Sequence, residues 1–149
     1  MDLLERALAL AACPLFATLA PAAVIRLAER ATVVTLAPDD RRVTEDTVWV
    51  VATGALAILP RASRESGSAL ASIGAFQRRG SVARPGHVVG LIRVVAPATP
   101  VVEAVAETHS TLLALGIDDI RDLLEEDPAT LAAFADSLAR LLLAEAPAP

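Results

Sequence analysis

The sequence predicts an α+β fold with a β-rich centre between helical ends. Three observations lead to this prediction. Apolar residues recur at helical spacing up to residue 30, runs rich in β-branched residues occupy 31–116, and helical spacing returns over 117–144. Strands grouped between blocks of helices are typical of α+β architecture. Residues 145–149 remain as a short tail.

Length and composition predict a single domain over residues 1–149. The chain is 54% hydrophobic but only 3% aromatic, so its core has to be built from Ala, Leu and Val. The formal net charge is −5 and all 13 basic residues are Arg, scattered along the chain. A surface that binds nucleic acid needs concentrated positive charge. The composition therefore disfavours nucleic acid as a partner.

Two N-terminal helices are expected within residues 1–30. Pro21 is suited to the first turn of the second helix, which ends near Arg30. The first helix is indicated by apolar residues at helical spacing, namely Leu3, Leu4, Ala7, Leu8 and Ala11.

The centre of the chain, residues 31–116, is expected to hold the strands. Gly54 separates two of them as the glycine of a tight turn. We expect a solvated turn at 39–42, which follows Pro38, and a long loop over 60–84 with one strand at 68–73. The remaining strands are predicted at 32–36, 48–52, 55–59, 101–106 and 111–115.

Two C-terminal helices are predicted at 118–126 and 128–144. Asp127 is suited to cap the second helix and Pro128 to begin it. A broad apolar face of this helix is formed by Leu131, Phe134, Leu138, Leu141 and Leu142. Two roles for this face fit the sequence: packing in the core of the domain, or pairing with a second protomer.

One glycine-containing segment carries the clearest motif. Pro85-Gly86-His87-Val88-Val89-Gly90-Leu91 resembles the phosphate-binding cassette of cyclic nucleotide-binding domains, P-G-D-x-x-G-E-x-A-L followed by R-[ST]-A. Residues 13–28 and 49–58 resemble the opening helices and a strand hairpin of the same family. The resemblance spans about residues 8–143. It implies an antiparallel β-roll or jelly-roll-like barrel flanked by N-terminal helices and two C-terminal helices, with a short cassette helix near 91–95.

The motif departs from the family at the charged positions. Counted without gaps from Gly90, Leu91 stands where the family has its ribose-binding Glu, and Pro100 where it has its phosphate-binding Arg. Val101 replaces the hydroxyl residue that follows. A buried phosphate needs charge-assisted hydrogen bonds to offset its desolvation. A cyclic nucleotide is therefore disfavoured, and no cofactor is expected.

A remnant of the ligand site would consist of backbone amides and one arginine. Amides at the start of a helix attract anions, and Arg93 could turn into the pocket in place of the missing Arg. His87 stands at the family's usual Asp position and is interpreted as structural. The candidate ligand-binding residues are Gly86, Gly90, Leu91, Ile92 and Arg93.

The preferred interpretation is a non-enzymatic regulatory or scaffolding module that has lost nucleotide binding and contacts another protein. The alternative is a working sensor of a cyclic nucleotide or another small anion through backbone amides and Arg93. A homodimer through the last helix is a further possibility. The candidate interaction residues are Arg61, Arg64, Arg78 and Arg79 in the long loop, and Leu138, Leu141 and Leu142 in the last helix. The simpler interpretation of the long loop is a solvated segment without a partner.

Other chemistry has little support in the sequence. Cys13 is the single cysteine and lies in an apolar run, where a small buried side chain is expected. The two histidines are far apart, and His109 is interpreted as a turn residue, so no metal site is predicted. No nucleophile elbow or P-loop indicates an enzyme. No run approaches the length of a membrane span, no DNA-reading helices follow the last helix, and a cytoplasmic protein is expected.

Overall fold

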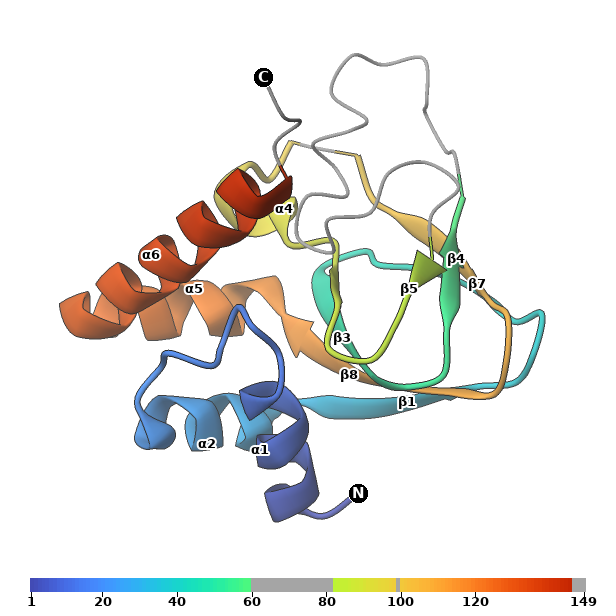
Figure 1. The fold of residues 1–149 in the computed structure, drawn as a ribbon, viewed down its shortest axis with the longest axis horizontal. Coiled ribbons are helices and arrows are strands. Elements are labelled where there is room, and N and C mark those ends of the chain that lie inside the picture. The colour runs from blue at the N-terminus through green and yellow to red at the C-terminus, as the bar shows by residue number, and fades with distance from the viewer. Residues whose placement is uncertain (60–81, 99, 146–149) are drawn as a thin grey trace.

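The computed structural model describes residues 1–59, 82–98 and 100–145 (Figure 1). Helix α1 (Leu3–Ala11) begins with a capping box, in which the Asp2 side chain accepts from the Glu5 amide and the Glu5 side chain accepts from the Asp2 amide. Helix α2 (Pro21–Arg30) begins with a proline, as predicted. Both helices precede the strands.

The first sheet contains strands in the order β1-β8-β3-β6, all antiparallel. Its long central strands are β8 (Ser110–Gly116) and β3 (Thr47–Thr53), which pair along their length apart from an irregularity between Val51 and Thr53. The edge strands are β1 (Thr32–Leu36) and β6 (Val88–Val89). The predicted strand at 32–36 is confirmed with the same bounds.

The second sheet has the order β2-β7-β4-β5 and is also antiparallel. Its strands are β2 (Arg41–Val43), β7 (Glu103–Ala106), β4 (Leu56–Ile58) and β5 (Val82–Ala83). Together the sheets form the predicted α+β roll, and among the described strands they do not close into a barrel.

Two local predictions for this sheet are wrong. Arg41 and Arg42 begin β2 instead of completing a turn, because they pair with Val105 and Ala104 of β7. The turn itself lies before β2, at Asp39, whose φ is 73°. The end of the predicted loop over 60–84 is a strand, since β5 pairs with β4. The strand predicted at 68–73 lies outside the described residues.

The first sheet separates two apolar cores because successive side chains on a strand face opposite sides. Along β3, Val48 and Val50 face the helices, whereas Trp49 and Val51 face the second sheet. The helix-side core also takes in Cys13, which is buried as expected. Both faces of the central strands are therefore buried, so β3 and β8 read as continuous hydrophobic runs.

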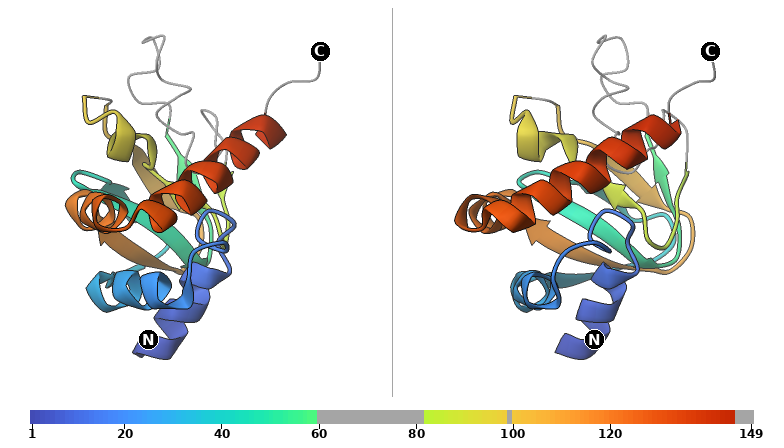
Figure 2. Two further views of the ribbon diagram at one scale, coloured as in Figure 1. Left: turned by 90° about the vertical axis from the view of Figure 1, so that its left-hand side faces the viewer. Right: turned by 60° about the vertical axis from the view of Figure 1, so that its left-hand side comes forward.

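The C-terminal helices pack on the N-terminal part of the chain. Helix α5 (Ile117–Glu126) lies beside α2, and helix α6 (Pro128–Glu145) crosses the helix side of the molecule next to the loop between α1 and α2 (Figure 2). The rings of Phe16 and Phe134 are 6.4 Å apart. The hydroxyls of Thr18 and Ser137 are hydrogen-bonded at 2.5 Å.

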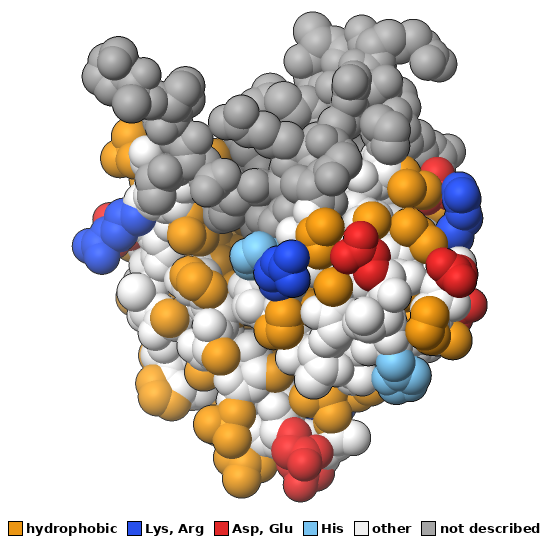
Figure 3. Space-filling model, turned by 45° about the vertical axis from the view of Figure 1, so that its right-hand side comes forward, with side chains coloured by type: hydrophobic (Ala, Val, Ile, Leu, Met, Phe, Trp, Pro, Cys, Tyr) orange, Lys and Arg blue, Asp and Glu red, His pale blue; other side chains and the backbone are white. Residues whose placement is uncertain are grey.

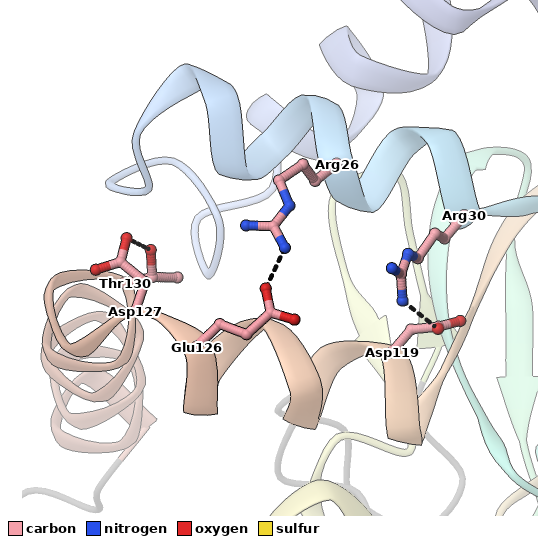
Figure 4. Close-up of polar contacts among 6 residues, drawn as sticks. All are labelled: Arg26, Arg30, Asp119, Glu126, Asp127 and Thr130. Atoms are coloured by element: carbon pink, nitrogen blue, oxygen red, sulfur yellow. Dashed lines mark hydrogen bonds and ion pairs between the residues drawn. The ribbon is translucent and has the colours of Figure 1, made fainter.

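Ion pairs line the contact between α2 and α5 (Figure 4). Arg30 Nη1 lies 2.9 Å from Asp119 Oδ1, and Arg26 pairs with Glu126. Asp127 caps α6 as predicted, since its carboxylate accepts from the Ala129 amide at 3.0 Å and from the Thr130 hydroxyl at 2.8 Å.

Candidate ligand-binding cassette

The cassette begins with a turn that joins the two sheets. The turn runs from Arg84 to His87: the Arg84 amide donates to His87 Nδ1 at 2.9 Å, and the His87 amide donates to the Arg84 carbonyl at 2.9 Å. Gly86 has φ 90°, a conformation that glycine adopts without a steric penalty. The Gly86 amide and the His87 carbonyl both bond to Val51 of β3. His87 thus has the structural role expected for it.

Gly90 follows β6 in a second left-handed conformation, with φ 85°. A Cβ at this position would lie 3.1 Å from Cγ2 of Thr44, which is closer than ordinary van der Waals contact. The positive φ favours glycine here, and any larger residue would also have to push the Thr44 side chain back by a few tenths of an ångström. These two local constraints account for a glycine at this position of the chain.

Leu91 is only 2% exposed and belongs to the helix-side core. It precedes the short cassette helix α4 (Ile92–Val95), which lies within the predicted range. The next residue, Ile92, packs against the core between the two sheets. A carboxylate at position 91 would lose its hydration among apolar side chains. The side chain at the family's ribose-binding position is therefore a core residue in this chain.

The Arg93 side chain is bound to backbone carbonyls of its own chain. Nη1 donates to the Glu45 carbonyl at 2.6 Å, and Nη2 donates to the Pro97 carbonyl at 3.3 Å. The buried Nε has no hydrogen-bond partner among the described residues. Arg93 itself is half-buried. It ties α4 to the turn between β2 and β3.

The segment that should carry the family's Arg is joined to Thr44. Pro100 is exposed and Val101 is half-buried. The Val102 amide donates to Thr44 Oγ1 at 3.1 Å, and the Thr44 amide donates to the Val102 carbonyl at 2.9 Å. Thr44 is itself buried. It therefore holds this segment beside Gly90, a role that no motif in the sequence indicated.

No protein-family model matches this sequence, and no curated protein matches it either. Solved structures do match in fold. The N-terminal domain of a transcriptional regulator from Streptomyces coelicolor is 24% identical, with 95% of this chain and 93% of that chain covered and a TM-score of 0.63. A protein from Ruegeria pomeroyi, described as a cyclic nucleotide-binding protein, is 15% identical, with 100% and 66% covered and a TM-score of 0.70.

This chain has the fold of the cyclic nucleotide-binding domains. A third structure with this fold is the regulatory subunit of a cAMP-independent protein kinase A from Trypanosoma cruzi, bound to guanosine. It is 18% identical, with 83% of this chain and 40% of that chain covered and a TM-score of 0.60. The neighbours named as regulators are regulatory domains or subunits rather than enzymes.

Within this cyclic nucleotide-binding fold, the core between the two sheets is apolar. It contains Trp49, the single tryptophan, together with Leu36, Leu56, Val89 and Leu112. The buried Ser110 lies on the same face of β8 as Leu112, and its hydroxyl is bonded to the backbone of Ala55 and Thr108. Apolar side chains can pack against a base or a sugar, but they offer no donor to a phosphate.

The other predicted site residues fall into two groups. Arg61, Arg64, Arg78 and Arg79 lie outside the described residues. Leu138, Leu141 and Leu142 are half-buried on α6, and the first two pack against the helix-side core. On the face in Figure 3, the described arginines stand apart from one another instead of forming a basic patch.

Two absences concern only the part of the chain that the structure describes. Its residues include no group of three or more His, Cys, Asp or Glu side chains that could hold a metal ion. No helix within it is long and apolar enough to cross a bilayer. A surface groove between α2 and α5 is lined by the ion-paired residues of both helices, which the sequence analysis did not single out.

Proposed function

We propose that this chain is a regulatory or scaffolding module that contacts another protein and does not hold a cyclic nucleotide. The observation that carries the proposal is the burial of Leu91 in the helix-side core. The buried leucine side chain cannot make a polar contact to a ribose, so nothing at this position substitutes for the family's carboxylate. Pro100, at the family's phosphate-binding position, is exposed and has no charge.

The state of Arg93 also supports this proposal. Both terminal nitrogens of its guanidinium donate to carbonyls of the chain, so a phosphate would have to compete with bonds that already exist. Bonds to a charged donor contribute about 1.5–3 kcal/mol. A ligand would need to replace these interactions before it gained any affinity from Arg93.

A second candidate function is a sensor for a nucleoside or another small ligand. It is favoured by the buried Arg93 Nε, which lacks a hydrogen-bond partner among the described residues, and by the apolar core between the sheets. The Trypanosoma cruzi neighbour shows that this fold can be bound to guanosine.

Thermal unfolding with added ligands separates the two functions. Cyclic AMP, cyclic GMP and guanosine are tested, with 5′-AMP as the non-cyclic phosphate control. A ligand at 100 times its Kd stabilises the native state by about 2.7 kcal/mol. We expect no shift with any of them. A shift that is specific to one ligand and absent in Arg93→Ala would establish the sensor function instead.

We place the protein contact of this module on the outer face of α6. Apart from the Asp136–Arg140 ion pair, this face consists of apolar and small side chains, and Leu131 is 47% and Leu143 75% exposed. A helix that is apolar on nearly all sides is normally buried in an assembly. The occupant we propose is a partner protein; a second copy of this chain, joined through Leu138, Leu141 and Leu142, is the competing occupant.

The α6 contact is tested with Leu131→Lys, which leaves the core face of the helix unchanged. We expect the variant to keep the unfolding temperature of the wild type and to lose association with the partner. If light scattering shows a wild-type homodimer that Leu131→Lys dissociates, α6 pairs two copies of the chain and the proposed partner contact is wrong.

A further inference from the structure

The negative charge of this chain is concentrated on its two C-terminal helices. Residues 117–145 carry eight acidic side chains and only two basic ones, Arg121 and Arg140. Arg121 is half-buried, and Arg140 is paired with Asp136 at 3.0 Å. Because the formal net charge of the whole chain is −5, the remaining residues are close to neutral as a group. A surface of one sign attracts partners of the opposite sign. The C-terminal helices therefore favour a positively charged partner.

Part of this charge forms a row along α5. Asp118, Asp122 and Glu125 follow one another at i, i+4 and i+7, so they share one face of the helix. All three are exposed, and no hydrogen bond or ion pair joins their carboxylates to another described residue. Two further carboxylates of α5, those of Asp119 and Glu126, are paired with arginines of α2. The acidic row is thus the part of α5 that no described arginine neutralises.

The exposed apolar face of α6 begins next to the end of this row. Helix α6 starts where α5 ends, and the two helices pack against each other (Figure 2). Leu131 and Leu143 lie about 18 Å apart along α6, and both are exposed. On the same face, between these leucines, the exposed residues are alanines, namely Ala132, Ala135 and Ala139. Large side chains on either side of small ones form a surface onto which another helix can pack.

We propose that the partner bound through α6 presents a basic amphipathic helix. This inference rests on the proposed function, which places a protein contact on α6, and it specifies the partner. The apolar side of the partner helix covers Leu131 and Leu143. Lys or Arg side chains at one end of the partner helix lie near Asp122 and Glu125. In recognition of this kind, apolar anchors provide affinity, and charges provide orientation and a faster encounter.

The charge pattern favours such a partner over a second copy of this chain. In a symmetric pair, both copies contribute the same surface, so α6 and the neighbouring α5 of one copy meet α6 and α5 of the other. Two negatively charged surfaces would then face each other, which costs free energy. The single arginine of α6, Arg140, is already paired with Asp136 of the same helix. A basic helix supplies the positive charge that a second copy lacks at this surface.

The test uses two synthetic peptides of about 14 residues, long enough as helices to span the α6 face. Both have leucines at the same helical positions, and their remaining positions are all Lys in one and all Glu in the other. Fluorescence anisotropy of the labelled peptides measures their binding to the full chain. We expect the Leu/Lys peptide to bind, more weakly as salt is raised, and the Leu/Glu peptide not to bind. Equal binding of both peptides, or binding of neither, would overturn the inference.

Paired variants separate the acidic row from the net charge of the chain. Asp122→Asn/Glu125→Gln removes two charges of the row and keeps Asp118, which is favourable at the start of a helix. We expect this variant to bind the Leu/Lys peptide about fivefold more weakly. The matched control, Glu29→Gln/Glu107→Gln, removes as much charge at exposed positions outside α5 and α6 and should bind like the wild type. Equal losses in both variants would overturn the inference.

Leu131→Gln separates this inference from the proposed function, because it removes an apolar side chain without adding charge. We expect it to weaken binding of the Leu/Lys peptide as well. If Leu131→Gln weakens both peptides alike and the acidic-row variant has no effect, the α6 contact stands and the basic partner is wrong. If the acidic-row variant weakens binding and Leu131→Gln does not, the peptide binds α5 alone, and both the inference and the α6 contact are wrong.

Discussion

Two glycines of the cassette, Gly86 and Gly90, have nearly the same φ but different surroundings. Gly86 has φ 90°, and the nearest atom to a built Cβ is a carbonyl oxygen 3.8 Å away. Gly90 has φ 85° and faces the Thr44 side chain at 3.1 Å. The pair therefore separates the cost of a left-handed backbone from the cost of crowding.

We expect Gly86→Ala to lower the free energy of unfolding by about 1–2 kcal/mol through backbone strain alone. Gly90→Ala should cost about 1 kcal/mol more, because its methyl group also meets Thr44. Urea denaturation of both variants measures the difference. Equal losses would mean that Thr44 shifts freely and that the contact imposes no constraint.

Leu91 allows a direct test of the altered cassette at a single residue. Replacing it by Glu restores the family's side chain but places a carboxylate in the helix-side core. We expect Leu91→Glu to cost about 3–5 kcal/mol of unfolding free energy, since the buried charge has no partner. Leu91→Met, which conserves volume, should cost less than about 1.5 kcal/mol. A stable Leu91→Glu variant would contradict the burial argument.

At the scale of elements, Asp127 holds the junction between α5 and α6. The pKa of the Asp127 carboxyl lies below its ordinary value of 3.8. The main cause is the hydrogen bond that it accepts from the Thr130 hydroxyl, and the next is the bond from the Ala129 amide. A carboxyl group whose pKa is lowered by folding stabilises the native state above its ordinary pKa. This stabilisation is lost as the pH falls through the lowered value.

We therefore expect acid to destabilise the wild type more than Asp127→Asn, whose side chain can still accept from Ala129 but cannot titrate. The measurement is the free energy of unfolding of both proteins between about pH 5 and about pH 2. Thr130→Val is the control for the cause, and NMR titration should show a higher pKa of Asp127 in it. Parallel pH profiles of wild type and Asp127→Asn would rule out this linkage.

The ion pairs between α2 and α5 contribute less than the apolar contacts beneath them. The side chains of Arg26 and Glu126 are each about half exposed. Exposed pairs of this kind are worth at most about 1 kcal/mol and are screened by salt. The apolar side chains of the helix-side core, such as Leu27 and Leu123, therefore hold these helices together.

At the scale of the whole molecule, the first sheet is shared by two cores. Each core contains one natural probe: Cys13 on the helix side and Trp49 between the sheets. Burial raises the pKa of the Cys13 thiol from 9.0 to about 11, so the thiol is unreactive in the native state at neutral pH. Because β3 and β8 line both cores, neither core can be lost while the other stays intact.

We expect urea unfolding monitored by Trp49 fluorescence and by Cys13 labelling to give coincident transitions, as in a two-state protein. Because unfolding lowers the pKa of Cys13 to its ordinary value, stability should also fall as the pH rises from about 9 toward about 11. Cys13→Ala is the control, and its stability should change less over that range. Separate midpoints for the two probes would show that the cores unfold independently.

Much of the architecture could be predicted from local patterns. Pro21 and Asp127 marked helix starts, and β-branched runs marked β1, β3, β4 and β8. The strands that were missed are short. Strands β2 and β6 have only three and two residues, so neither has an internal periodicity to detect, and each exists because a neighbouring strand supplies its hydrogen bonds.

The sequence by itself determined the class of fold and the cassette glycines, because periodicity, caps and backbone conformation are local properties of the chain. Only the tertiary structure decided what the cassette side chains do. The burial of Leu91 and the bond from Arg93 to the Pro97 carbonyl depend on how the elements pack. The bond from Arg93 to the Glu45 carbonyl and the pairing of Thr44 with Val102 join residues that are distant in sequence. Such contacts follow from long-range packing, which a local sequence pattern does not encode.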